Sequence, residues 1–178
     1  MTYVWICFIL FLSMALEFSL ALLGFSVPLT YMGGFYFTLL FGWRRSALPF
    51  MAFSVLLELS FGRSLPFLLL FSLPVMFGAF IWRRYGNLKE TTVQALPGFC
   101  IGLASVVASL GYTLVFSLNA TGKIYPFSPM PMLMQMLSGT ILFPVYCALL
   151  DGFAKDLGYR RYRLVHRFQV EETDYAGQ

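Results

Sequence analysis

Three ionisable side chains stand inside or beside long apolar segments of this chain: Glu17, Glu58 and Arg63. A charge in such a segment is costly unless it is paired, so each of these residues requires a partner or a function. Two carboxylates held together can act as general acid and base, which makes an intramembrane enzyme one interpretation. Neither a nucleophile nor a metal ligand accompanies Glu17 and Glu58 in the sequence, so this interpretation is the weakest.

A docking or structural role is the alternative for the same residues. Glu17 lies in the second half of the first apolar segment, Glu58 lies near the end of the third, and Arg63 lies in the turn that follows. We expect the three side chains to lie at one depth, with Glu17 facing Arg63 or a polar group of another subunit. Glu58 and Arg63 can also reach the lipid headgroups separately, because this is easy near a helix end.

Other residue types that carry chemistry show no useful spacing. The single histidine, His166, stands in the basic C-terminal segment far from any nucleophile. Four methionines alternate along the chain, which would suit Cu(I) but is better explained by gap filling at a helix start: Met130, Met132, Met134 and Met136. Three cysteines lie in separate apolar segments and are interpreted as packing residues: Cys7, Cys100 and Cys147. We predict no catalytic residue, cofactor site or metal site.

Composition identifies the class of protein. Of the 178 residues, 59% are hydrophobic and 11% are charged, and the mean hydropathy is +0.76. A soluble domain has about a quarter of its residues charged, so the sequence predicts an integral membrane protein. The net charge of +4 would suggest nucleic acid in a soluble protein. Here the basic residues mark topology instead, and we expect no nucleic-acid partner.

Six apolar segments predict an all-α bundle of about six transmembrane helices, at 3–23, 28–42, 46–59, 65–82, 93–118 and 132–150. The first is expected to be retained, because it lacks the basic region of a signal peptide. The second is short and contains Gly33-Gly34, so we expect a tilted, broken or partly re-entrant helix. Kinks are expected near Pro49 and Pro74. The predicted division is a bundle at 1–150 and a cytoplasmic tail at 151–178.

Residues 43–84 are predicted to form a helical hairpin. The same Trp-Arg-Arg motif stands at both of its ends, as Trp43-Arg44-Arg45 and Trp82-Arg83-Arg84. Tryptophan and arginine at the ends of apolar segments are typical interfacial anchors. Further anchors are predicted in the tail: Arg160, Arg161 and Arg163. The tail mixes basic with apolar residues, which favours binding to anionic lipids. Its last residues are acidic, and we expect them to be disordered.

The distribution of charge predicts the topology. Ten of the twelve Lys and Arg residues fall on one side of the six-segment arrangement. The positive-inside rule then places both termini in the cytoplasm. A five-segment arrangement, which omits the short second segment and sends the N-terminus outside, ranks second.

Small residues recur along one face of the fifth segment, at spacings of four, three and four: Gly98, Gly102, Ser105 and Ser109. Such a stripe lets another helix backbone approach closely. We predict a packing face, and we favour its use within the chain over its use in binding a partner.

The hairpin resembles the MreD family of bacterial rod shape-determining membrane proteins. The resemblance rests on an arginine-flanked entry, an apolar helix ending in an acid, a short glycine-containing turn and a second apolar helix closing on basic residues. These are Arg44-Arg45, Leu56-Leu57-Glu58-Leu59, Phe61-Gly62-Arg63-Ser64-Leu65-Pro66 and Trp82-Arg83-Arg84. The chain differs from the family in having Glu58 where Asp is usual and Ser54 where Gly is usual.

This resemblance implies a non-enzymatic scaffold of the elongation machinery in the bacterial cytoplasmic (inner) membrane. Members of the family support peptidoglycan synthesis and cell shape together with MreC and the pair formed by RodA and a penicillin-binding protein. The basic tail could then bind anionic lipid or the actin-like filament MreB.

The main alternative is an importer component. Substrate-binding membrane subunits of energy-coupling-factor vitamin importers are also six-helix proteins of this length, but they usually carry paired alanines four residues apart on the first helix. This chain offers only Ala15 and Ser19 at that spacing. Its outward loops are also short of ligand-binding groups, apart from Asn119, Thr121, Lys123 and Tyr125. An outer cavity lined by convergent polar groups would favour the importer.

Overall fold

The computed structural model describes residues 2–63, 67–85, 94–121 and 129–158, and these residues are all-helical. Their six helices are α1 (Thr2–Leu22), α2 (Leu29–Phe41), α3 (Trp43–Ser60), α4 (Phe67–Tyr85), α5 (Ala95–Thr121) and α6 (Pro129–Asp156). The predicted all-α class is confirmed. Four of the helices, α1, α4, α5 and α6, are long and apolar enough to cross a membrane.

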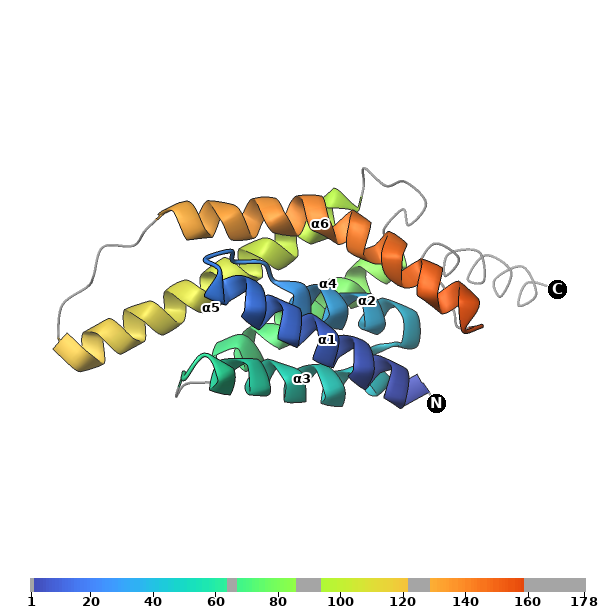
Figure 1. Ribbon diagram of the computed structural model, residues 1–178, viewed down its shortest axis with the longest axis horizontal. Helices are drawn as coiled ribbons and strands as arrows, with labels where there is room; N and C mark the ends of the chain where they lie inside the picture. Colours follow the sequence, from blue (N-terminus) through green and yellow to red (C-terminus); the bar gives the residue numbers. More distant parts are fainter. Residues whose placement is uncertain (1, 64–66, 86–93, 122–128, 159–178) are drawn as a thin grey trace.

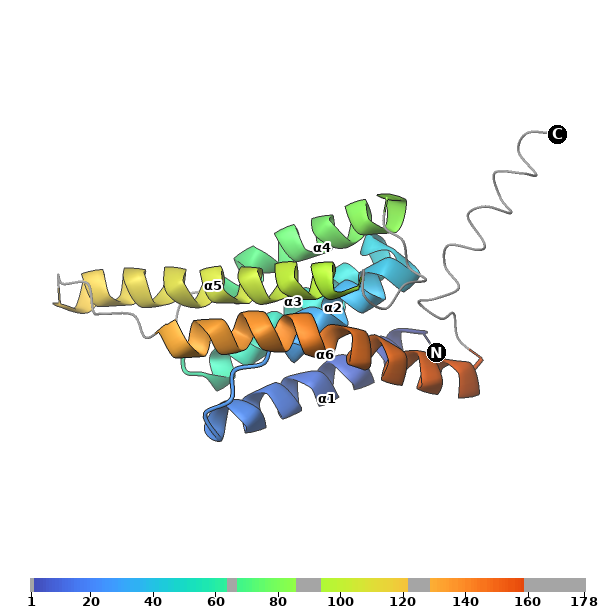
Figure 2. The ribbon, with the colours of Figure 1, turned by 90° about the horizontal axis from the view of Figure 1, so that it is seen from above.

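Successive helices run in opposite directions along the long axis of the molecule (Figure 1). The start of α1 and the end of α6 therefore lie at the same end of the molecule. We call this the N-terminal end, and it also holds the short connection between α2 and α3. The connections from α1 to α2 and from α3 to α4 lie toward the opposite end, where α5 projects beyond α1 and α3 (Figures 1 and 2).

Helix α2 is the centre of the bundle. It contacts every other helix, and 11 of its 13 residues are buried. A helix of this length spans about 20 Å, which is less than the roughly 30 Å of a hydrocarbon core. The helix is continuous, so the predicted break is absent. Its shortness is accommodated because its neighbours, rather than lipid, surround it.

Two adjacent glycines bring the neighbours close to α2. A Cβ on Gly33 would lie only 2.8 Å from the hydroxyl oxygen of Tyr146 in α6, and a Cβ on Gly34 would overlap the ring of Phe50 in α3. A larger residue at either position would force a neighbouring side chain to move, so glycine permits the observed close packing. The Gly33-Gly34 pair is a packing feature of an intact helix.

Two helix boundaries differ from those of the predicted apolar segments. Gly42 alone separates α2 from α3 and has a φ of 79°, which favours glycine. Trp43 and the two arginines after it therefore form the first turn of α3 rather than a loop. At the other boundary, α6 continues to Asp156. Asp151 is buried and accepts a 2.8 Å hydrogen bond from the hydroxyl of Tyr36, so 151–156 extends the bundle. The predicted anchors Arg160, Arg161 and Arg163 lie outside the described residues.

The two glycines of the predicted small-residue face lie against α6. A Cβ on Gly102 would lie 2.7 Å from the carbonyl oxygen of Gln135, and a Cβ on Gly139 would lie 2.5 Å from that of Gly98. Helices α5 and α6 therefore touch backbone to backbone, as small residues allow. The glycines of the stripe therefore serve packing within the chain.

We expect Gly139→Ala to lower the free energy of unfolding by about 1–3 kcal/mol, because the added methyl group overlaps α5. Gly152→Ala is the matched control on the same helix, since a Cβ there meets nothing within 4 Å. This control should be neutral or stabilising by up to about 1 kcal/mol. Chemical denaturation in detergent micelles, followed by circular dichroism, measures both. Equal effects of the two substitutions would contradict the packing assignment.

Candidate functional site

Helix α2 begins inside the bundle, because the connection after α1 carries the chain back among the other helices (Figure 2). The first N–H groups of a helix have no partner within the helix. Pro28, at the N-cap position of α2, supplies no side-chain hydrogen bond. Instead, the backbone N–H of Thr30 donates to Oε2 of Glu17 at 2.7 Å. The carboxylate of α1 thus caps α2, where the positive end of the helix dipole also favours a negative charge.

Glu58 of α3 caps the start of α4 in the same way. The backbone N–H of Leu68, the second residue of α4, donates to Oε1 of Glu58 at 2.6 Å. The carbonyl oxygen of Leu68 accepts a 2.7 Å hydrogen bond from the hydroxyl of Tyr31 in α2. Glu58 is only 2% exposed. One buried carboxylate therefore joins the end of α3 to the start of α4, next to the central helix.

Arg63 is held by aromatic rings. Its guanidinium carbon lies 5.3 Å from the ring centre of Phe61 and 5.0 Å from that of Tyr112 in α5. Both distances are within the range of a cation–π contact. The half-buried arginine therefore links the turn after α3 to α5, with its charge in a defined place.

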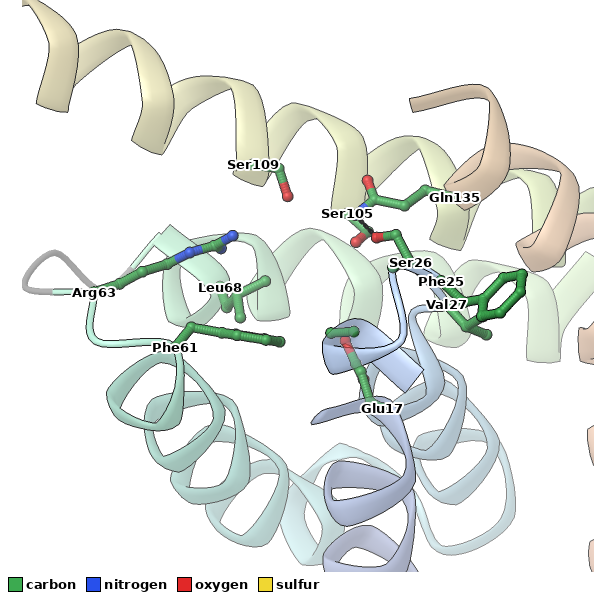
Figure 3. Close-up of a pocket in the computed structure, with 12 residues that line it drawn as sticks. Glu17, Phe25, Ser26, Val27, Phe61, Arg63, Leu68, Ser105, Ser109 and Gln135 are labelled. Atoms are coloured by element: carbon green, nitrogen blue, oxygen red, sulfur yellow. Dashed lines mark hydrogen bonds between the residues drawn. The ribbon is translucent and has the colours of Figure 1, made fainter. Parts of the chain in front are cut away.

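These elements enclose a cavity of about 210 Å³ at the end of the bundle opposite the N-terminal end. We call it the polar cavity. Figure 3 shows side chains from α1, α5, α6 and two connections pointing into it. Its polar lining consists of Glu17, Ser26, Arg63, Ser105, Ser109 and Gln135.

The polar cavity brings together four residues that the sequence singled out. Glu17 and Arg63 line it from opposite sides, but the direct hydrogen-bond donor to Glu17 is the backbone of α2 rather than the guanidinium. Ser105 and Ser109, the second half of the small-residue stripe, also face it. Glu58 is outside the lining and reaches the cavity wall through Leu68. The stripe therefore has two uses, with glycines for packing and serines for the cavity.

Four contributing residues were not predicted. The side-chain amide of Gln135 donates to the hydroxyl of Ser26, and the hydroxyl of Ser138 donates to the Ser26 carbonyl at 3.2 Å. Gln135 is the only amide side chain in the apolar segment 132–150. An isolated polar residue in an apolar segment was the signal by which the sequence could have revealed its role in the site. Nothing in the sequence pointed to Tyr112, because its role depends on where α5 lies relative to Arg63.

The chemical capacity of the polar cavity follows from its groups. It presents one guanidinium, one carboxylate and several hydroxyl and amide groups, which suits hydrogen bonding to a charged or polar group. Within residues 2–63, 67–85, 94–121 and 129–158, no three His, Cys, Asp or Glu side chains gather as metal ligands. Each of the two glutamates accepts a backbone N–H at the start of a different helix.

The two Trp-Arg-Arg motifs lie at the N-terminal end, away from the polar cavity. Although 38 positions separate Arg45 from Arg83 in the sequence, both arginines line one cleft there. Trp43 lines a neighbouring depression with Arg83 and Arg84. The arginine pairs are thus neighbours in space.

Comparison of the chain with protein-family models, curated proteins and solved structures finds no match. The resemblance to the MreD family stays a prediction from the sequence.

We expect Glu58→Leu to lower the free energy of unfolding by about 1–2 kcal/mol, because the start of α4 loses its acceptor. Glu58→Gln should cost less, since the amide oxygen can still accept from Leu68. Ser60→Ala is a control on the same helix turn, where the exposed hydroxyl bonds only to its own helix. Denaturation in micelles measures all three variants. A leucine variant no less stable than the glutamine variant would contradict the capping role.

Proposed function

We propose that the chain is a multi-pass protein of the bacterial cytoplasmic membrane with both termini in the cytoplasm. The support comes from four helices of spanning length and from the distribution of charge. Among the described residues, five basic residues belong to the parts of α3, α4 and α6 at the N-terminal end: Arg44, Arg45, Arg83, Arg84 and Lys155. Arg63 is the single described basic residue toward the other end. The positive-inside rule then assigns the N-terminal end to the cytoplasm.

Within that membrane, we propose a non-enzymatic scaffold subunit of the MreD type. It would support peptidoglycan synthesis and cell shape by binding MreC and the pair of RodA and a penicillin-binding protein. The observation that carries this proposal is the corner at 58–63. Glu58 ties α3 to α4, and Arg63 contacts the rings of Phe61 and Tyr112 and lines the polar cavity. The residues behind the family resemblance thus form a preorganised charged corner, which suits docking because little ordering is needed on binding.

The projecting part of α5 adds apolar surface beside this corner. Phe116 is 56% exposed and Leu118 is 44% exposed. An exposed apolar surface next to a fixed charge is the composition expected of an interface, with anchors for affinity and a charge for specificity. A partner on the outward side could contact both features at once.

A second candidate, the substrate-binding subunit of an energy-coupling-factor importer, is favoured by the convergent polar groups of the same cavity. The size of the cavity favours the scaffold. The cavity volume of about 210 Å³ is below the roughly 300–1,000 Å³ usual for small-molecule sites. A single side chain or loop tip of a partner protein fits this volume better than a vitamin does. We therefore place the scaffold first.

Affinity capture of the tagged full chain from bacterial membranes tests the proposal. Recovery of MreC, or of RodA with its penicillin-binding protein, is the result expected of a scaffold. Recovery of an ATPase-coupled transport module would overturn it in favour of the importer. Capture of the tagged chain without recovery of either group of partners would contradict both assignments.

We expect Arg63→Gln to reduce recovery of the partner by at least about tenfold, because the partner loses its charged contact. Arg63→Lys should retain part of the recovery, since the positive charge remains although the planar stacking is lost. Lys155→Gln removes one charge at the other end and serves as the control. Quantitative mass spectrometry of the captured material, normalised to the amount of bait, measures the effect. Equal recovery with Arg63→Gln and Lys155→Gln would contradict the docking corner.

A further inference from the structure

A cleft at the N-terminal end of the bundle gathers positive charge that the proposed function does not use. Its volume is about 540 Å³, and three arginines line it together with the start of α1 and the end of α6: Arg44, Arg45 and Arg83. The turn at Gly42 lies beside Arg83, since a Cβ at position 42 would be in ordinary contact, at 3.7 Å, with Nη1 of that arginine. The start of α3 and the end of α4 are therefore brought together beside the end of α2. We call this the arginine cleft.

The charged side chains among the described residues that line the arginine cleft are all positive. Its lining includes no Asp or Glu among the described residues. Three guanidinium groups around one depression repel one another unless an anion lies between them. Guanidinium groups match phosphate oxygens in geometry and hydrogen-bonding capacity. The cleft is thus suited to a phosphate group.

An apolar groove of about 270 Å³ runs between α1 and α6, the two helices whose ends border the arginine cleft. Figure 2 shows these helices side by side as they approach the N-terminal end. The groove lining is aliphatic and aromatic, and includes Ile9, Leu12, Leu16, Val145, Leu149 and Phe153. Several of these side chains are about half exposed: Leu12, Leu16, Val145, Leu149 and Phe153. The groove is therefore open to the surroundings along its length.

The groove begins near the arginine cleft. Phe153 lines the groove and Gly158 borders the cleft. These two residues are five positions apart, or about 8 Å at the rise of an α-helix. Ile9 follows Thr2, also at the cleft, by seven residues, or about 10 Å. A positive site for phosphate followed at this distance by an apolar channel has the polarity of a phospholipid.

We propose that the N-terminal end binds one anionic phospholipid, with its phosphate at the arginine cleft and an acyl chain in the groove between α1 and α6. A free phosphate would use the arginines but would leave the groove empty. A zwitterionic lipid would fill the groove but would bring a positive group to the arginines. The anionic phospholipid satisfies both features. This site is separate from the polar cavity and does not depend on the docking partner.

Native mass spectrometry of the delipidated full chain in detergent, with phosphatidylglycerol or phosphatidylcholine added back, tests the proposal. We expect one phosphatidylglycerol to bind at least about tenfold more tightly than phosphatidylcholine. Inorganic phosphate should not compete at millimolar concentration. Equal affinity for the two lipids, or full competition by inorganic phosphate, would overturn the proposal.

Arginine substitutions test the headgroup site. Arg45→Gln should weaken phosphatidylglycerol binding by about fivefold, and the triple change of Arg44, Arg45 and Arg83 to Gln by about a hundredfold. Arg84→Gln is the matched control, because it removes the same charge at the same end but does not line the arginine cleft. An equal loss for Arg84→Gln and Arg45→Gln would mean diffuse attraction and would overturn the site. If the triple variant does not fold, the two single variants decide the question.

Groove substitutions test the acyl-chain site. Val145→Trp fills the groove and should weaken binding of phosphatidylglycerol by at least about fivefold. Ile141→Trp is the control, since Ile141 is exposed on the same helix but is not part of the groove lining. The protein should retain its melting temperature in both cases, because both side chains already face outward. Unchanged binding in Val145→Trp would overturn the assignment of the groove.

Discussion

A helix that begins inside an apolar bundle has backbone N–H groups that water cannot reach, and this constraint governs the molecule. Unsatisfied buried N–H groups are costly, so each must find an acceptor. Glu17 supplies one for α2 and Glu58 supplies one for α4. Two side chains that look like candidates for chemistry in the sequence are therefore structural acceptors at helix starts. Each of them lies at the positive N-terminal end of the helix that it caps.

The central position of α2 depends on these contacts. A helix of 13 residues is too short to cross a hydrocarbon core alone, but it can start deep in the bundle if another helix completes its first turn. Glu17 does this, and Tyr31 then fastens α2 to the start of α4 through Leu68. At the far end, Gly42 reverses the chain directly into α3. The hairpin at 43–84 is thus built around the short helix that precedes it.

The two ends of the bundle have different chemistry as a consequence. At one end, the capped helix starts and Arg63 form the wall of the polar cavity, which we assign to a protein partner. At the other end, the reversal at Gly42 places Arg44 and Arg45 beside Arg83, which we assign to a phospholipid headgroup. Both assignments combine a fixed positive charge with neighbouring exposed apolar surface. They differ in what that surface can receive, a protein side chain at the projecting α5 and a lipid chain in the groove along α1.

The sequence by itself determined the helical class, the six helices with most of their limits, and the positions of the isolated charges. Apolar length, the glycines at 98 and 102 and the isolated charges are local properties, so composition and spacing reveal them. The partners of Glu17 and Glu58, the aromatic rings around Arg63 and the meeting of Arg45 with Arg83 were decided only by the tertiary structure. Each of these contacts joins different helices, and a one-dimensional pattern does not specify how helices are placed around one another. The continuation of α6 beyond 150 has the same origin, because Asp151 is buried and bonded to Tyr36 of another helix.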